Sequence, residues 1–287
     1  MLQYVPWRQI TFTGRLFDVG EGRATTLLFL LKCLIYMALD IVIWVALTFL
    51  SYKLLVWTFF TPFERGFYCN DQSIREPLVP NTVSTSLLIA ITLGAPFFFI
   101  FLADLMRTTR PRRRNITQVI NRSTLEYLNY CIAFWLMTLA IDAFKCLIGR
   151  IRPNFLSMCK PREWSEVCTV TPDAYVKLAH CTVGWKNSRN SKMSFPSGHA
   201  AASVFCTLFL VFYLRSIQSR FPTLFLRFLF IFVSIAYIAF TLFCCISRIT
   251  DAWHFPTDVL GGSLLGASLY FALLHKNITT STAAHHQ

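Results

Sequence analysis

The apolar residues of the chain fall into six long runs, near residues 27–50, 83–103, 125–148, 200–214, 223–246 and 259–274. A helix needs about 20 predominantly apolar residues to cross the hydrocarbon core of a bilayer. The fourth and sixth runs are short, and they need the polar residues at their ends to complete a crossing. The pattern predicts six transmembrane helices joined by polar loops.

Composition supports the same fold class. The 287 residues are 55% hydrophobic and only 14% charged, with a mean hydropathy of +0.51. This balance is too apolar for an ordinary soluble domain. We therefore predict an all-α membrane protein in which residues 1–287 form a single six-span domain. No short apolar region followed by a small-residue cleavage site opens the chain, so no removable signal peptide is expected.

Charge sets the predicted orientation. A formal net charge of +13 would suggest nucleic-acid binding in a soluble chain, but basic cytoplasmic loops account for it in a membrane protein. We expect no nucleic-acid partner. Because positive loops stay in the cytoplasm, the loops after the second and fourth runs and both termini are placed there. The residues concerned are Arg107, Arg110, Arg112, Arg113, Arg114 and Arg122, then Arg215 and Arg220, and Arg8, Arg15 and Arg23.

The basic loop 150–192 is an exception, because alternation of the spans puts it outside. Loop 52–82 and the residues around His254 fall on that same side. We give alternation precedence because the exceptional loop is longer than the cytoplasmic ones. The predicted protein is a multi-pass protein of the plasma membrane or an endomembrane, and the sequence does not choose between these locations.

The ten cysteines divide between spans and outer loops. Cys69, Cys159, Cys168 and Cys181 lie in the two large outer loops. Four cysteines in an oxidising compartment permit one or two disulfides, in three full connectivities that the sequence does not separate. No CxxC pair is present, which argues against a thiolate zinc site. The other six are interpreted as packing residues in or beside spans: Cys33, Cys131, Cys146, Cys206, Cys244 and Cys245.

A first cluster of polar residues precedes the sixth run. If a helix begins near Pro256, a favoured first-turn residue, His254 stands at its mouth and Asp258 lies about one turn inside. A carboxylate there can hold one imidazole nitrogen as N–H and leave the other bare, as a nucleophile or base. Arg248 offers a planar fork of donors to phosphate or carboxylate. The alternative is a histidine that caps a membrane helix beside a snorkelling arginine.

A second cluster ends the third run. Lys145 and Arg152 are seven residues apart, so they are predicted to project from one face of a helix that ends where Pro153 disfavours helical geometry. Asp142 is the expected charge partner of Lys145, because a lone ion within a span costs about 3 kcal/mol or more. Snorkelling cations at a helix end are the alternative interpretation.

The third cluster begins the fourth run. Ser197 is a good helix N-cap, and Gly198 lets the backbone come close to a ligand. Free N–H groups at such a helix start form an anion site, with His199 at its edge. A capping turn with an incidental histidine is the alternative. The predicted topology brings all three clusters to the same outer interface. It is improbable that three unrelated structural clusters would meet there by chance.

The combined motifs resemble the type 2 phosphatidate phosphatase superfamily, and within it the animal-type lipid phosphate phosphatases. Stretches 65–74 and 148–155 and the six-span layout also match, so the resemblance covers nearly the whole chain. One departure is Pro196, where animal members usually have tyrosine; proline is the form of the wider superfamily. The motifs are Lys145-x6-Arg152-Pro153, Pro196-Ser197-Gly198-His199 and Ser247-Arg248-x5-His254-x3-Asp258.

The resemblance implies a phosphomonoesterase that needs no metal or other cofactor. By analogy, His254 attacks phosphorus and forms a phosphohistidine, Asp258 orients it, and His199 protonates the leaving alkoxide and later activates water. The phosphoryl oxygens are then held by Lys145, Arg152, Arg248 and the Ser197 and Gly198 amides. Physical chemistry agrees, because preorganised cations and amides stabilise the charge of a phosphoryl transition state. The motifs also lack the surplus carboxylates that magnesium sites use.

The predicted function is the hydrolysis of lipid phosphate monoesters at the outer or lumenal membrane interface. The class-level substrates are phosphatidate, lysophosphatidate, ceramide 1-phosphate and sphingosine 1-phosphate, with the bilayer as the second partner. Alternatives are a phosphatase for a soluble ester, a transporter, or a catalytically silent lipid-binding scaffold. The complete acid, nucleophile and cation set argues against silence. The preferred lipid and the formation of a homo-oligomer are left open.

Overall fold

The computed structural model describes residues 61–107, 116–218 and 224–275, with a few isolated positions before residue 61. The first predicted span, near residues 27–50, lies outside these three ranges. Both termini and the basic cluster Arg110, Arg112, Arg113 and Arg114 lie outside them as well. The number of six spans therefore remains a prediction.

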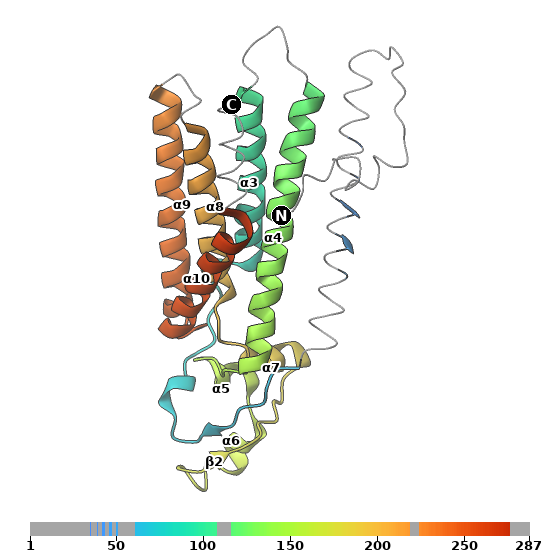
Figure 1. The fold of residues 1–287 in the computed structure, drawn as a ribbon. Coiled ribbons are helices and arrows are strands. Elements are labelled where there is room, and N and C mark those ends of the chain that lie inside the picture. The colour runs from blue at the N-terminus through green and yellow to red at the C-terminus, as the bar shows by residue number, and fades with distance from the viewer. Residues whose placement is uncertain are drawn as a thin grey trace.

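Five helices in the described ranges are long and apolar enough to cross a membrane, which confirms the all-α membrane class (Figure 1). They are α3 (Thr85–Arg107), α4 (Ile116–Ile148), α8 (Gly198–Gln218), α9 (Leu224–Thr250) and α10 (Pro256–Tyr270), the last continued by the π-helix η5 (Phe271–His275). As expected for the two short apolar runs, α8 and α10 begin at residues of the polar motifs, and these residues add to the length of each helix.

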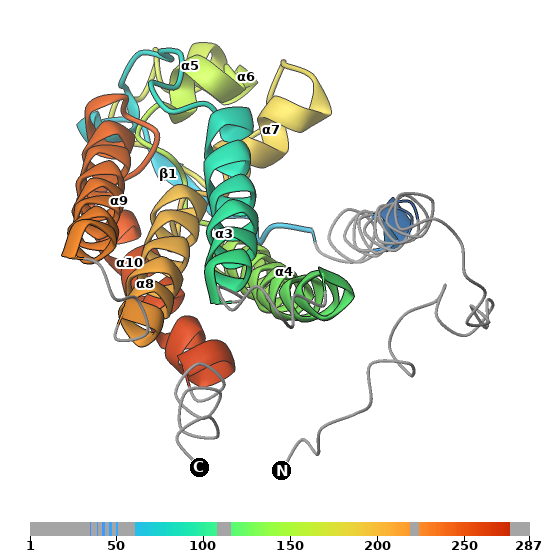
Figure 2. The ribbon, with the colours of Figure 1, turned by 90° about the horizontal axis from the view of Figure 1, so that it is seen from above.

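Helix α8 forms the centre of the bundle. Seen from above, it lies between α9 and α3 (Figure 2), and its side chains are largely buried. Aromatic rings fill the interior, with the rings of Tyr130 and Phe209 4.5 Å apart and those of Phe205 and Tyr270 6.2 Å apart. Helix α9 is buried mainly at its ends, so most of its apolar side chains face outward, as lipid-facing residues do.

Two glycines bring α10 into backbone contact with α8. A Cβ at Gly262 would lie 2.3 Å from the carbonyl oxygen of Ser197, and one at Gly266 would lie 2.5 Å from that of Ala201. Side chains larger than hydrogen therefore do not fit between the two helices at these points, as at other close helix crossings in membranes. The contact holds the first turns of α8 and α10 together, and these turns carry the second and third motifs.

Beyond one end of the bundle lies a layer built from the described part of loop 52–82 and from loop 150–192, which we call the outer layer after the side predicted for it (Figure 1). Its strands pair antiparallel, with Phe67 opposite Val176. Disulfides join Cys69 to Cys168 and Cys159 to Cys181, and the first of these ties the first outer loop to the second. The elements are β1 (Phe67–Tyr68), η3 (Gln72–Ile74), α5 (Phe155–Cys159), α6 (Arg162–Glu166), β2 (Tyr175–Val176) and α7 (Trp185–Ser191).

One predicted helix boundary is wrong. Helix α4 ends at Ile148, so Lys145 and Arg152 do not share a helix face. The chain turns at Gly149, whose φ of +60° lies in the left-handed region that favours glycine. A Cβ there would lie 2.0 Å from the carbonyl oxygen of Phe63. The turn at Gly149 ends the helix before Pro153 is reached, so Arg152 lies in the loop that follows α4.

Candidate active site

The three polar motifs meet where the bundle adjoins the outer layer. Lys145 lies in the last turn of α4, His199 in the first turn of α8 and Arg248 in the last turn of α9. His254 occupies the turn between α9 and α10, and Asp258 lies in the first turn of α10. The clustering predicted from topology is therefore present in the structure.

The ring of His254 lies between an arginine and a carboxylate. Its Nε2 is 3.2 Å from Nη1 of Arg152, and its Nδ1 is 3.7 Å from Oδ2 of Asp258. Because a guanidinium only donates, this contact assigns a lone pair to Nε2 and the proton to Nδ1. Asp258 faces Nδ1 across a distance longer than a hydrogen bond, so the predicted orienting hydrogen bond is not formed and only a close electrostatic contact is present.

Burial controls the protonation of His254, whose side chain is only 5% exposed. Desolvation, and then the positive charge of Arg152, lower the pKa of His254 well below its ordinary value, although Asp258 acts in the opposite direction. The imidazole is therefore neutral near pH 7. A buried, neutral ring with a lone pair on Nε2 is what a nucleophilic histidine requires.

Arg152 is fixed by the backbone of two loops. Its Nε donates to the carbonyl of Asn190 at 2.7 Å and its Nη1 to that of Trp253 at 2.8 Å, with the guanidinium over the Trp253 ring. Burial lowers the pKa of Arg152 to about 10, so it keeps its charge at neutral pH. Within the described ranges Nη2 donates to no protein group, which leaves it available to an anion.

Arg248 is held by residues that sequence reasoning missed. Its Nη1 donates to Oδ1 of Asn81 at 2.6 Å, and its Nη2 to Oδ2 of Asp251 at 3.1 Å. Thr82 donates to both Asp251 oxygens at 2.8 Å, through its main-chain N–H and its hydroxyl. The spacing of Arg248 and Asp251, one helical turn, is a signal that could have indicated the pair. Asn81 and Thr82 belong to the first outer loop, and only folding brings them here.

The residue that follows the first outer loop orients His199. Nε2 of His199 lies 3.2 Å from the carbonyl oxygen of Val83. A carbonyl only accepts, so Nε2 carries a proton and Nδ1 is the nitrogen left to exchange one. Trp253, which stacks on Arg152, donates its indole N–H to the carbonyl of Val79 in the same segment at 3.0 Å. Residues 79–83 therefore line one side of the site.

Lys145 lies against the start of α8. Its Nζ forms the expected ion pair with Asp142, at 3.1 Å, and a Cβ on Gly198 would be 3.3 Å from that Nζ. Ser197 differs from expectation. Its hydroxyl is buried and has no hydrogen-bond partner among the described residues, so it caps nothing there, while its main-chain N–H donates to the carbonyl of Asp258 at 2.9 Å. The amide of Gly198, together with that of His199, is what the helix start can offer to an anion.

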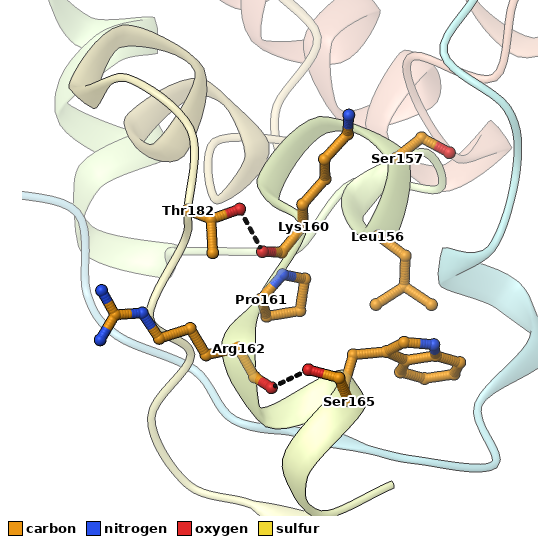
Figure 3. Close-up of a pocket in the computed structure, with 8 residues that line it drawn as sticks. Leu156, Ser157, Lys160, Pro161, Arg162, Ser165 and Thr182 are labelled. Carbon is orange, nitrogen blue, oxygen red and sulfur yellow. Dashed lines mark hydrogen bonds between the residues drawn. The ribbon is translucent and has the colours of Figure 1, made fainter. Parts of the chain in front are cut away.

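A surface hollow in the outer layer is a separate feature (Figure 3). Its hydroxyl groups are satisfied internally, since Thr182 donates to the carbonyl of Lys160 and Ser165 to that of Arg162. The lining contains none of the predicted site residues. It consists of Leu156, Ser157, Lys160, Pro161, Arg162, Trp164, Ser165 and Thr182.

Within the described ranges, no group of three or more His, Cys, Asp or Glu side chains is arranged to hold a metal ion.

Comparison with known proteins identifies relatives of the chain. Residues 126–280 match the PAP2 superfamily. Phospholipid phosphatase 2 of Bos taurus is 33% identical over 213 residues, covering 72% of this chain and 71% of the relative. Phospholipid phosphatase 1 of Mus musculus is 31% identical over 244 residues, covering 82% and 81%. A putative phosphatidate phosphatase of Drosophila melanogaster is 27% identical over 230 residues, covering 72% and 59%. No solved structure matches the chain.

Proposed function

The chain belongs to the PAP2 superfamily and is a phosphoric monoester hydrolase of the phosphatidate phosphatase type, and from that premise we propose that it hydrolyses lipid phosphates through a phosphohistidine. The class of substrate comprises phosphatidate, lysophosphatidate, ceramide 1-phosphate and sphingosine 1-phosphate. The observation that carries the mechanism is the buried, neutral ring of His254, with Arg152 at Nε2 and Asp258 facing Nδ1. The position of these groups at the ends of apolar helices supports a lipid, whose phosphate lies at that depth.

In the first step, Nε2 of His254 attacks phosphorus. The proton of neutral His199 is on Nε2, so its Nδ1 is bare in the free site, and we propose that Nδ1 takes a proton from the phosphate monoester monoanion when that substrate binds. The bond from phosphorus to the lipid oxygen then breaks as the N–P bond forms, and the leaving oxygen takes this proton from Nδ1 of His199. The ring of His254 gains positive charge, which the carboxylate of Asp258 stabilises. Nη1 of Arg152, which contacts Nε2 in the free enzyme, moves its hydrogen bond to a phosphoryl oxygen.

In the second step, a water molecule attacks the phosphohistidine. Nδ1 of His199, now neutral, accepts the proton of the water, the N–P bond breaks and inorganic phosphate leaves. The phosphoryl oxygens are held by Lys145, Arg152, Arg248 and the start of α8. These cations and amides are preorganised by their contacts in the folded chain, so they stabilise the transition state without reorganising.

Purified protein should release phosphate from a panel of lipid phosphates in excess EDTA. All groups in the proposed mechanism belong to the chain, so a chelator removes nothing that they need. Vanadate, which mimics a trigonal-bipyramidal phosphoryl group, should inhibit strongly. The measurement is inorganic phosphate released with and without EDTA and vanadate.

Three outcomes of that panel would contradict the proposal. Activity abolished by EDTA and restored by magnesium would overturn the metal-free mechanism. Preference for a soluble ester such as a sugar phosphate would replace the lipid substrate. Lipid binding without phosphate release would indicate a silent scaffold.

We further propose that the site faces the outside or the lumen and that both termini face the cytoplasm. The two disulfides of the outer layer lie at the same end of the bundle as the histidines, and disulfides persist in oxidising compartments. An impermeant thiol reagent should label Cys69, Cys159, Cys168 and Cys181 on sealed cells after reduction. A cysteine introduced by Arg112→Cys should resist labelling until the membrane is permeabilised. The reverse labelling pattern would show that the orientation is inverted.

A further inference from the structure

Asp258 is the point at which all three motifs touch. Its side chain is completely buried, and Oδ2 accepts a hydrogen bond from the Ser194 hydroxyl at 2.6 Å and another from the Phe255 main-chain N–H at 2.9 Å. Oδ1 accepts one from Nη1 of Arg150 at 2.6 Å. Within the described ranges, Arg150 is the only arginine or lysine in direct contact with this carboxylate. A buried carboxylate without a cationic partner is costly, so this contact has consequences for the site.

Arg150 is itself held firmly. The same Nη1 also donates to the hydroxyl of Thr257 at 2.7 Å, and the guanidinium lies 4.4 Å from the centre of the Phe255 ring. A cation at this distance over an aromatic face is attracted to it. The carbonyl of Arg150 accepts a hydrogen bond from the main-chain N–H of Ser194 at 2.9 Å. The arginine is therefore held to the first turn of α10 on one side and to Ser194, just before the second motif, on the other.

These contacts link four side chains in a row, Arg152, His254, Asp258 and Arg150, with the proposed nucleophile second in the row. Arg152 donates to Nε2 of His254, Nδ1 faces Oδ2 of Asp258, and Oδ1 is bound by Arg150. The turn at Gly149 allows this arrangement, because it ends α4 and places Arg150 and Arg152 in the loop beside Asp258 and His254. Arg152 contacts the reacting nitrogen, whereas Arg150 contacts only the carboxylate behind the ring.

We propose that Arg150 is a positioning residue for the nucleophile, a role that rests on the phosphohistidine mechanism proposed above. It keeps Asp258 ionised and turned toward Nδ1, so that the carboxylate can stabilise the positive ring that forms when His254 takes the phosphoryl group. Both hydrogens of its Nη1 are used on Thr257 and Asp258. Its contacts lie at Asp258, behind the Nδ1 side of the ring, whereas the phosphoryl group is bound at Nε2. We therefore expect Arg150 to act on the rate of phosphoryl transfer and to leave the binding of the phosphoryl group unchanged.

Arg150→Ala should lower the rate of phosphoenzyme formation on nitrophenyl phosphate by about tenfold to hundredfold, with an unchanged inhibition constant for vanadate. The loss is smaller than for a fully buried ion pair because the Arg150 side chain is 35% exposed. Arg150→Lys keeps the positive charge but loses the planar guanidinium, and its rate of phosphoenzyme formation should lie between those of Arg150→Ala and the wild type. Because the site of the missing guanidinium opens to solvent, millimolar methylguanidinium should restore part of the rate in Arg150→Ala only.

The control variant is Arg162→Ala, which removes an arginine from the outer-layer hollow and should leave both readouts unchanged. If Arg150→Ala does not fold, Arg150→Lys decides: a rate equal to that of the wild type overturns the proposal. A parallel loss of vanadate affinity and rate would also overturn it, because Arg150 would then be a phosphate-binding residue. Hydrolysis by the wild type without any acid-labile phosphoenzyme would overturn the proposed mechanism and this role together.

Discussion

His254→Ala is expected to abolish phosphoryl transfer on a lipid phosphate and on nitrophenyl phosphate alike. Loss of the nucleophile from a catalytic unit costs on the order of 10⁴-fold or more in rate. The quality of the leaving group does not matter here, because no N–P bond can form. The measurement is a burst assay combined with acid-labile phosphate on the protein, and both should be absent.

The matched control is His180→Ala. This histidine lies in the outer layer, exposed and paired with Glu163, and it contacts no residue of the site. Its variant should retain the burst and the phosphoenzyme. An acid-labile adduct on His254→Ala would assign the nucleophile to another residue.

His199→Ala is expected to separate the two substrates. A lipid alkoxide is a poor leaving group and needs the proton that His199 supplies, and general acid catalysis of this kind contributes about 10²–10⁴-fold. A nitrophenolate leaves without a proton, so the first step should survive largely on nitrophenyl phosphate. The second step needs His199 as a base, and the phosphohistidine should therefore accumulate on that substrate.

The readouts are the size of the burst and the amount of acid-labile phosphate, compared between the two substrates. Equal losses of the first step on both would show that His199 does not act on the leaving group. If His199→Ala forms no adduct with either substrate while His254→Ala does, the roles of the two histidines are reversed. If the His180→Ala control also loses the burst or the acid-labile phosphate, substitution of a histidine disturbs folding, and the losses cannot be assigned to catalysis.

Local sequence was sufficient to predict the helical class and to single out the candidate site residues that the fold brings together. Long apolar runs leave few options in a bilayer, because every backbone polar group there needs an internal partner. The polar clusters stood out at the ends of these runs, since charged groups are costly in a membrane. The ion pair of Lys145 with Asp142 followed from helical periodicity alone.

The partners of the site residues required the folded chain. Asn81 and Val83 bind Arg248 and His199 across 167 and 116 residues of sequence, and nothing in either local pattern indicates the other. The same holds for Arg150 and Asp258, which are 108 residues apart. The sequence motif contains Arg150 beside Arg152, and spacing alone treats both as cations near a helix end.

The clearest difference between sequence and structure lies at Gly149. Proline rules predict a helix that continues to Arg152, because they consider only the next residue along the chain. The helix ends earlier because Gly149 adopts the left-handed φ of +60°, and the backbone of Phe63, from the first outer loop, packs so closely there that no side chain fits. The sequence by itself determined the helices and the candidate reactive residues, since these depend on local periodicity and on the cost of polar groups in lipid. Only the tertiary structure decided which nitrogen of each histidine is free and which donor holds each charge, because these depend on contacts between loops distant in sequence.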